Sequence, residues 1–327
     1  GPPDVVFGHI GWGSMLFARD VLPNTPLLGY CEHYYHADGR DVGFAKDEKV
    51  SLAKRTQLRL RNSAQLSTLD HLDVALSPTP WQKTAFPDAY QHKIGVCHDG
   101  IDVHRCRPNP QATLKMPDGR VLRAGAPVVT YVARDLEPYR GFPTFMRSAA
   151  KLAALNPDAI FVVAGGDGVS YGTPRTDGRK WRDVMMEETG LDPSRIYFLG
   201  QISHEHLIRL FQISAAHIYL TYPFVLSWSV LEAMACGAAV IASDTGPCHD
   251  VIKDRHNGLL TDFWDTDALA DKMIYSLENP AQLMPLRQEA RRTITQHFAL
   301  QKCLEKQTSL IERLAAGEIE RVVGRRG

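Results

Sequence analysis

Residues 222–243 constrain the fold more than any other stretch, because a loop, a helix and a buried strand follow one another there. Residues 229–236 are rich in the helix formers Leu, Glu, Ala and Met, and Gly237 can adopt the left-handed conformation that ends a helix. The apolar run 239–242 has the length of a buried parallel strand. This order predicts an α/β domain in which the N-terminus of the helix faces a ligand-binding cleft.

The start of this helix has two interpretations. Backbone N–H groups at Ser229 and Val230, together with the hydroxyls of Ser227 and Ser229, can hold an anion such as a diphosphate. Glu232, one turn further on, can then accept hydrogen bonds from sugar hydroxyls. Alternatively, Glu232 only favours the positive end of the helix dipole and binds nothing. This stretch by itself leaves both interpretations open.

Apolar strand signals alternate with helical segments along the chain. The strand signals lie at residues 4–8, 26–31, 74–77, 93–96, 127–132, 159–163, 195–199, 217–220 and 239–242, and a long helical segment lies at 48–69. Repeated units of this kind predict an α/β fold with doubly wound parallel sheets. At 327 residues the chain exceeds one average core, so we expect two domains.

The division between the two domains is marked by a change in composition. Residues 105–127 hold four prolines and the turn sequence Pro117-Asp-Gly119, which predict a hairpin. We therefore expect a first domain at 1–107, a hairpin linker at 108–126, a second domain at 127–295 and a helical tail at 296–327. The tail carries Leu310, Ile311 and Leu314 on one apolar stripe.

The overall composition excludes some classes of partner and location. The net charge is zero and the isoelectric point is near 7.3, so no basic field favours nucleic acid. The six cysteines form no even framework, and the first residues do not resemble a signal peptide. No apolar run is long enough to span a bilayer. We therefore expect a cytoplasmic protein with a small-molecule partner, with peripheral contact at the inner face of the membrane as an alternative.

A run rich in histidine and cysteine invites a zinc interpretation. It contains Cys97, His98, His104 and Cys106. Zinc sites repeat pairs of ligands at characteristic spacings, whereas this run is a single cluster with adjacent donors. We expect no metal.

Polar residues also follow the first two predicted strands. His9 and Gly11 come after the first strand, and Glu32 and His33 after the second. A carboxylate and histidines at strand ends can orient or deprotonate an acceptor hydroxyl, although polar loop residues without a catalytic role fit equally well. The basic helical segment 48–61 is either a solvated face or a contact for an anionic lipid or glycolipid.

Two arginines flank the first turn of the second domain. Arg134 ends the predicted strand at 127–132 and Arg140 precedes Gly141 and the next helix. Each guanidinium can donate a bidentate pair of hydrogen bonds to phosphate oxygens, so together they can clamp a diphosphate. Surface salt bridges are the alternative.

Taken together, these features resemble the GT4 family of retaining glycosyltransferases. The similarity covers about residues 4–300 and is strongest at 128–262. It rests on Ala133-Arg134-Asp-Leu with Arg140-Gly141, Ala164-Gly-Gly-Asp-Gly168, Phe198-Leu-Gly200, Leu231-Glu-Ala-Met-Ala-Cys-Gly237, Gly246-Pro and Asn257-Gly-Leu-Leu260. The resemblance implies the GT-B fold, in which two Rossmann-like domains face a cleft and the C-terminal helix packs back on the first domain.

The resemblance also implies roles for residues. Arg134 and Arg140 would stabilise the leaving diphosphate, Phe198 would border the nucleotide base, and Glu232 would bind the ribose. The donor site would further include Gly166, Asp167, Ser227, Ser229 and Val230.

The sequence departs from the family pattern at two places. Phe224 stands where the family has a glutamate that contacts the donor sugar, and the family's donor-contacting histidine corresponds to Glu32 or His33. The chain also begins downstream of the family's first strands and glycine-rich loop, so we expect an incomplete, short first domain.

The resemblance implies a hexosyltransferase that moves a sugar from a nucleotide diphosphate sugar to an acceptor hydroxyl with retention. The acceptor would be a saccharide or glycolipid, in polysaccharide or glycoconjugate synthesis, with no cofactor and no metal, and with a homo-oligomer as an option. Two alternatives are a non-catalytic nucleotide-sugar-binding module and a GT-B nucleotide-sugar epimerase.

Overall fold

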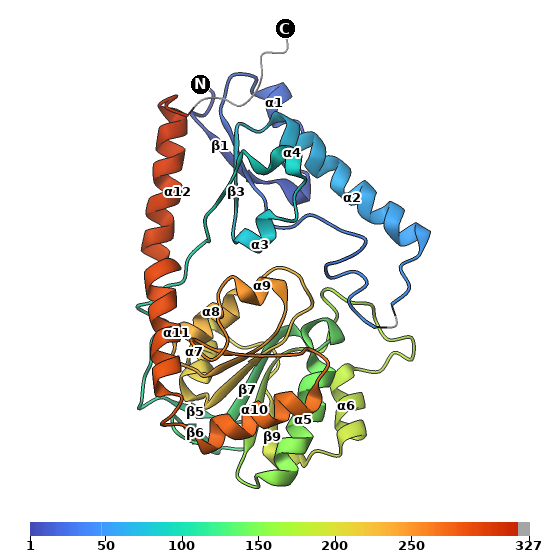
Figure 1. The fold of residues 1–327 in the computed structure, drawn as a ribbon, viewed down its shortest axis with the longest axis vertical. Coiled ribbons are helices and arrows are strands. Elements are labelled where there is room, and N and C mark those ends of the chain that lie inside the picture. Colours follow the sequence, from blue (N-terminus) through green and yellow to red (C-terminus); the bar gives the residue numbers. More distant parts are fainter. Residues whose placement is uncertain (47, 320–327) are drawn as a thin grey trace. The chain divides into compact units, whose positions relative to one another are not determined.

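The computed structural model describes residues 1–46 and 48–319. The chain forms two compact units, traced in Figure 1: unit 1 comprises residues 1–100, 223–225 and 298–327, and unit 2 comprises residues 101–222 and 226–297. The first division lies at Gly100, seven residues before the expected boundary at 107, and the hairpin expected as a linker belongs to unit 2. Residues 320–327 of the expected tail lie outside the described residues.

Unit 1 is built on a parallel sheet in the order β1-β2-β3-β4. Its strands are β1 (Val6–His9), β2 (Leu27–Tyr30), β3 (Val74–Ser77) and β4 (Ile94–Val96). Its helices are η1 (Ile10–Trp12), α1 (Ala18–Val21), α2 (Leu52–His71), α3 (Pro80–Lys83), α4 (Asp88–Gln91) and α12 (Leu300–Ala315). Each strand forms where the sequence has a short apolar run, as expected.

The two faces of this sheet are covered by different elements. One buried cluster joins Ile10, Leu27 and Phe86 to Leu69 and Leu72 at the end of α2. A second cluster contains Leu28, Leu76 and Cys97 together with Cys303 and Leu314 of α12. The alternation of side chains along β2 sends Leu27 and Leu28 to opposite clusters, so this unit buries apolar residues on both sides of its sheet.

The end of α2 is fixed to the sheet by a buried ion pair. The Asp73 carboxylate is almost fully buried and accepts a hydrogen bond from the backbone N–H of Leu27 at 2.8 Å. The same oxygen accepts from Arg19 Nη2 at 2.7 Å, and the Arg19 side chain is only 16% exposed. A buried carboxylate needs such partners, because burial removes its water.

Unit 2 holds a six-stranded parallel sheet in the order β12-β11-β10-β7-β8-β9 and the expected antiparallel hairpin of β5 and β6. The strands are β5 (Thr113–Lys115), β6 (Val121–Arg123), β7 (Val128–Asp135), β8 (Ile160–Gly166), β9 (Ile196–Phe198), β10 (Ala216–Tyr219), β11 (Val240–Ser243) and β12 (Leu259–Thr261). The short β12 was not predicted. The order reverses direction between β7 and β10, which is the switch point of a doubly wound sheet.

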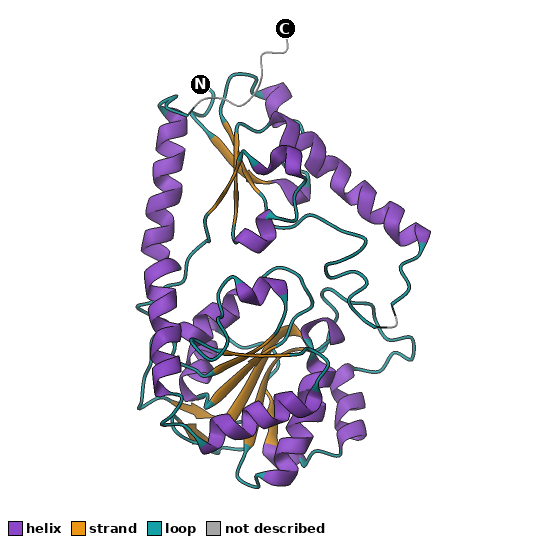
Figure 2. Cartoon of the chain, viewed as in Figure 1, coloured by secondary structure: helices purple, strands orange, loops and turns teal. Residues whose placement is uncertain are grey.

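Helices cover this sheet on both faces, as Figure 2 shows. They are η2 (Pro138–Arg140), α5 (Phe142–Leu155), α6 (Trp181–Thr189), η3 (Pro193–Arg195), α7 (His204–Ile213), α8 (Trp228–Ala235), α9 (Gly246–His249), α10 (Thr266–Glu278) and α11 (Met284–His297). One layer contains α5 with α6 and α10 against it, and the other contains α8 with α7 and α11 against it. The expectation of two parallel α/β units is therefore confirmed.

The helix that follows β10 starts and stops as its sequence predicts. Ser227 caps α8, and its Oγ accepts a hydrogen bond from the N–H of Ser229 at 3.3 Å. Gly237 follows the helix with a positive φ of 77°, where a side chain would be strained. Among the described residues, no helix is long and apolar enough to cross a membrane.

Candidate functional site

The residues singled out in the second half of the sequence gather at one edge of the unit 2 sheet. All neighbouring strands in this sheet are parallel, so their carboxyl ends share an edge. Arg134 lies at the end of β7, Gly166 and Asp167 at the end of β8, and Phe198 at the end of β9. The loop after β10 leads to Ser227. Ligands of doubly wound sheets bind at this edge.

The two arginines of the expected clamp differ in environment. Arg134 is exposed, and the structure shows no hydrogen bond or ion pair of its side chain with any described residue. Arg140 is only 8% exposed. Its Nη1 donates to Thr221 Oγ1 at 2.6 Å and to the Tyr219 hydroxyl at 3.4 Å, and its guanidinium lies 4.8 Å from the ring centre of Tyr171. Arg134 is therefore available at the surface, whereas Arg140 is buried against the residues just named.

Tyr219 connects Arg140 to the start of α8. Its hydroxyl oxygen accepts a hydrogen bond from the N–H of Ser227 at 2.8 Å while Arg140 donates to it. Burial raises the pKa of Tyr219 to about 12, although the Arg140 charge opposes the shift, so the phenol stays neutral at physiological pH. The remaining N–H groups at the first turn of α8 have no partner within the helix and can receive an anion.

Asp167 and Phe198 are linked through a third residue. The Asp167 carboxylate lies 3.2 Å from Arg182 Nη1 and 3.4 Å from Lys180 Nζ. The Arg182 guanidinium also lies 5.6 Å from the ring centre of Phe198. The Arg182 guanidinium thus contacts both the turn after β8 and the end of β9. This residue was not identified from the sequence.

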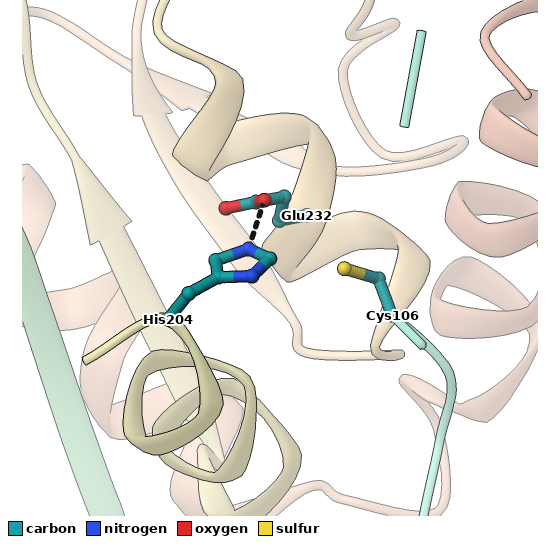
Figure 3. A group of neighbouring side chains, drawn as sticks. All are labelled: Cys106, His204 and Glu232. Carbon is teal, nitrogen blue, oxygen red and sulfur yellow. Dashed lines mark hydrogen bonds and ion pairs between the residues drawn. The ribbon is translucent and has the colours of Figure 1, made fainter. Parts of the chain in front are cut away.

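Glu232 faces α7 rather than open solvent. Its side chain is 12% exposed, and its Oε1 forms a 2.7 Å hydrogen bond with Nε2 of His204, the first residue of α7. Figure 3 shows both side chains together with Cys106, which approaches from the segment before the hairpin. The Glu232 carboxylate therefore has a specific hydrogen-bond partner. A favourable interaction with the helix dipole alone would not need such a partner.

Two carboxylates, one at the last residue of β7 and one two residues later, organise the loop that follows β8. Glu137 is 1% exposed and accepts hydrogen bonds from the N–H groups of Ser170, Tyr171 and Gly172 at 3.2, 3.0 and 2.8 Å. Asp135 accepts from the N–H of Gly168 at 3.0 Å and from the Ser170 hydroxyl. The loop that carries Tyr171 to Arg140 is thereby fixed.

The residues singled out in the first domain form two groups within unit 1. His9 Nε2 lies 3.0 Å from Glu32 Oε2, and the other ring nitrogen of His9 accepts from the N–H of Gly11 at 3.1 Å. His33 packs instead against Phe224, with ring centres 4.6 Å apart. Burial, with Arg40 and His36 nearby, lowers the pKa of His33 to about 3, so its ring is neutral.

The fold separates the run considered for zinc: Cys97 lies beside Cys303 in unit 1, whereas Cys106 belongs to unit 2. On the basic segment of α2, Arg55 forms a bidentate pair with Asp38 and Arg61 lies over the Tyr35 ring. Both arginines stay exposed, as does Arg59.

Comparison with protein families decides which family this arrangement belongs to. Residues 116–293 match the family described as "Glycosyl transferases group 1", and residues 1–106 match the "Glycosyl transferase family 4 group". The chain belongs to the glycosyl transferases group 1 family. The resemblance found in the sequence is thereby confirmed.

The chain is also similar to curated proteins and solved structures that carry related names. It is 29% identical over 261 residues to a D-inositol 3-phosphate glycosyltransferase from Mycobacterium sp. (strain JLS), covering 79% of this chain and 54% of that protein. With the enzyme of the same name from Rhodococcus opacus (strain B4) the identity is 28%, over 87% of this chain and 60% of that protein. The chain thus spans little more than half the length of these two relatives.

Solved structures show the same fold. Sucrose-phosphate synthase from Thermosynechococcus elongatus matches 96% of this chain and 74% of its own, with a TM-score of 0.75 and 21% identity. Anabaena Alr3699/HepE in complex with UDP and glucose matches 90% of this chain and 73% of its own, with a TM-score of 0.69 and 17% identity. The expected GT-B fold class is therefore confirmed.

Several site residues of this group 1 glycosyltransferase chain were missed from the sequence. They are Glu137, Tyr171, Arg182, His204, Tyr219 and Thr221. For some of them a signal existed: His204 follows the strand signal at 195–199, and Tyr219 lies within the signal at 217–220. Glu137 carries no local signal, because its partners are far away in the sequence.

Proposed function

We propose that this chain, as part of its protein, transfers a sugar from a nucleotide diphosphate sugar to an acceptor hydroxyl with retention of configuration. The observation that supports the proposal is the carboxyl-terminal edge of the unit 2 sheet: the unpaired cation of Arg134 lies near the end of β7, and the loop after β10 leads to the capped start of α8, the helix that carries Glu232. Membership of the group 1 family and the UDP complex of Anabaena Alr3699/HepE support it.

The chemistry requires stabilisation of a leaving group. As the bond between the sugar's anomeric carbon and the phosphate oxygen breaks, negative charge grows on the diphosphate. The Arg134 guanidinium and the N–H groups at the start of α8 would stabilise that charge electrostatically, with no metal in the reaction. Arg140 would act from behind, by holding Tyr219 and hence the Ser227 backbone in place. Glu232 would accept hydrogen bonds from the ribose hydroxyls.

The acceptor we propose is a hydroxyl of a saccharide or glycolipid, in the synthesis of a polysaccharide or glycoconjugate. The pair of Glu32 and His9 is the candidate for orienting that hydroxyl, because its carboxylate and imidazole share one hydrogen bond and stay partly exposed. Retention is expected to follow from attack on the same face that the diphosphate leaves, with the acceptor proton passing to the departing phosphate oxygen.

A screen of nucleotide diphosphate sugars with product analysis tests the proposal. Slow release of free nucleotide diphosphate without acceptor, and faster release with a saccharide acceptor, is the expected result. An epimerised sugar would show the epimerase, and saturable donor binding without any product would show a binding module; either would overturn the transferase proposal.

Glu232→Ala tests the nucleotide part of the proposal separately. Loss of two ribose hydrogen bonds of about 1 kcal/mol each should weaken UDP binding by roughly tenfold or more. Glu205→Ala is the matched control, since Glu205 is an exposed residue of α7 that pairs with Arg209. Equal UDP affinities for the two variants in calorimetry would contradict the assignment of Glu232.

A further inference from the structure

Three side chains with metal-binding atoms meet beside α8. Cys106 Sγ, a ring nitrogen of His204 and a carboxylate oxygen of Glu232 all lie within 4.8 Å of one another. They come from the segment before the hairpin, from the start of α7 and from the middle of α8 (Figure 3). Of the residues that the structure describes, this is the one group of three or more His, Cys, Asp and Glu side chains with this geometry.

The backbone around the cluster is fixed from behind. Arg291 on α11 donates hydrogen bonds to the carbonyl oxygens of Cys106 at 2.9 Å, Ala235 at 2.6 Å and Val103 at 3.2 Å. The Arg291 guanidinium therefore bonds to three carbonyl oxygens, which belong to the two segments that carry Cys106 and Glu232. The cluster is held before any ion arrives, so less side-chain and backbone freedom is lost on binding.

The donor set has the chemistry of a zinc site. Sulfur, imidazole nitrogen and carboxylate oxygen are the three ligand types that Zn²⁺ takes, with bond lengths of about 2.0–2.3 Å. Tetrahedral ligands at these lengths lie roughly 3.3–3.8 Å apart, so small side-chain rotations would close the cluster on an ion. Ca²⁺ and Mg²⁺ prefer oxygen ligands only and do not suit a thiolate.

A fourth ligand for a tetrahedral ion is also available next to the three side chains. Cys236 follows α8, is 3% exposed, and lies close to Cys106. The His204 side chain is 44% exposed, so solvent and ions can reach the site from its side. A fourth position can thus be filled either by Cys236 or by water.

We propose that Cys106, His204 and Glu232 form a binding site for Zn²⁺ or a similar borderline divalent cation. On binding, the Cys106 thiol loses its proton to solvent and a sulfur–zinc bond forms, while neutral His204 and ionised Glu232 donate lone pairs. One ion therefore binds per chain with release of one proton from the thiol. The proposed transfer step does not use this ion.

Zinc and the nucleotide sugar donor would compete for Glu232, an inference that rests on the proposed function. A zinc ion on one Glu232 oxygen leaves only the other oxygen to accept from the ribose hydroxyls and draws charge away from it. Zinc would therefore inhibit the transferase by lowering donor affinity, and nucleotide would lower zinc affinity by the same factor.

The experiment measures metal binding first, without nucleotide. Chelator-treated protein is titrated with ZnCl₂ in a metal buffer, and CoCl₂ serves as a spectroscopic probe for the thiolate-to-metal absorption band. Wild type should bind one ion per chain with that band. His204→Ala should weaken zinc binding by at least about tenfold, and Cys106→Ser should lower the intensity of the band.

His206→Ala is the matched control, because His206 is an exposed histidine two residues further along the same helix, and its ring is hydrogen-bonded to Ser203. It should bind zinc like wild type. Zinc binding that is unchanged in His204→Ala, or a cobalt complex without a thiolate band, would overturn the site. The Cys106→Ser variant is checked by thermal unfolding, and His204→Ala keeps the test decisive if that variant does not fold.

UDP binding is then measured at fixed free zinc. Zinc should lower UDP affinity in wild type and His206→Ala but not in His204→Ala, a contrast that removes the effect of zinc–UDP association in solution. Zinc binding without this competition would overturn the regulatory clause alone. Absence of UDP binding by zinc-free protein would instead contradict the proposed function and leave the metal site standing.

Discussion

Two ion pairs join polar side chains within unit 1, whereas unit 2 leaves the Arg134 cation at the edge of its sheet without a partner among the described residues. In unit 1, Arg19 pairs with the buried Asp73, and Glu32 pairs with His9. In unit 2, Arg134 stands exposed near the end of β7. An arginine next to a parallel sheet is thus structural in one place and available for a ligand in the other, and only its surroundings distinguish the two.

The largest expected effect comes from breaking the structural arginine. Arg19→Ala leaves the buried Asp73 carboxylate with the Leu27 N–H as its one hydrogen-bond donor among the described residues, so we expect a loss of about 3–5 kcal/mol in the free energy of unfolding. Urea denaturation measures it. Arg59→Ala, on the exposed face of α2, is the control and should change stability by less than about 0.5 kcal/mol. A similar small change for Arg19→Ala would show that water replaces the guanidinium.

A buried histidine in each unit makes the next comparison. Burial lowers the pKa of His217 to about 3, and His33 has a pKa near 3 for the same principal reason. Below the ordinary value near 6.5 the unfolded chain binds protons that the folded chain excludes, so both residues favour unfolding as the pH falls toward 3. Above pH 6.5 neither contributes to the pH dependence.

His217→Asn tests this sign. Each histidine should contribute about 1.4 kcal/mol of lost stability per pH unit between 6.5 and 4, and the variant should remove one such contribution. Asn can still donate to Thr130 Oγ1, which His217 Nδ1 contacts at 2.9 Å. Denaturation at several pH values gives the difference in slope between wild type and variant. Parallel pH profiles would mean that His217 accepts its proton in the folded state.

How far the sequence could anticipate this structure depends on the range of the interactions. Apolar runs located eight of the strands of the two parallel sheets within a few residues, because burial on both faces leaves a local signature. The ninth, at 74–77, matches β3 without any shift. β12 was missed because it is only three residues long. It overlaps the motif Asn257-Gly-Leu-Leu260, which was noted only for its resemblance to the family.

The site shows the same limit. The sequence placed Arg134 at the end of a strand, Ser227 at the start of a helix and Glu232 one turn into that helix, and the structure has Arg134 near the end of β7, Ser227 as the cap of α8 and Glu232 within α8. It could not show that Arg140 is buried against Thr221, or that Glu232 faces His204, since these contacts join residues 81 and 28 positions apart. Local patterns locate elements; they do not report the partners that elements bring together.

Truncating the two arginines of unit 2 should separate binding from stability. Arg134→Ala should weaken UDP binding by about tenfold or more, because charge-assisted hydrogen bonds are worth roughly 1.5–3 kcal/mol, and should leave the unfolding midpoint unchanged. Arg140→Ala should lower both, since it also leaves Thr221 and Tyr219 without a buried donor. Calorimetry and denaturation on the same samples make the comparison, and unchanged UDP affinity for both variants would contradict the diphosphate role.

The smallest expected effect concerns Phe224, which belongs to unit 1 although unit 2 residues flank it. Its ring lies 4.6 Å from the ring centre of His33 at an edge-to-face angle of 62°. Phe224→Leu keeps the apolar contact but loses the aromatic geometry, which is worth about 0.5–1.5 kcal/mol. Phe224→Tyr keeps the ring and is the matched control. UDP affinity should stay within about twofold for both, because we assign the nucleotide to unit 2. A loss of UDP affinity above about tenfold in Phe224→Leu alone would show that the loop at 223–225 is part of the donor site, and would place a ring where the family has a carboxylate.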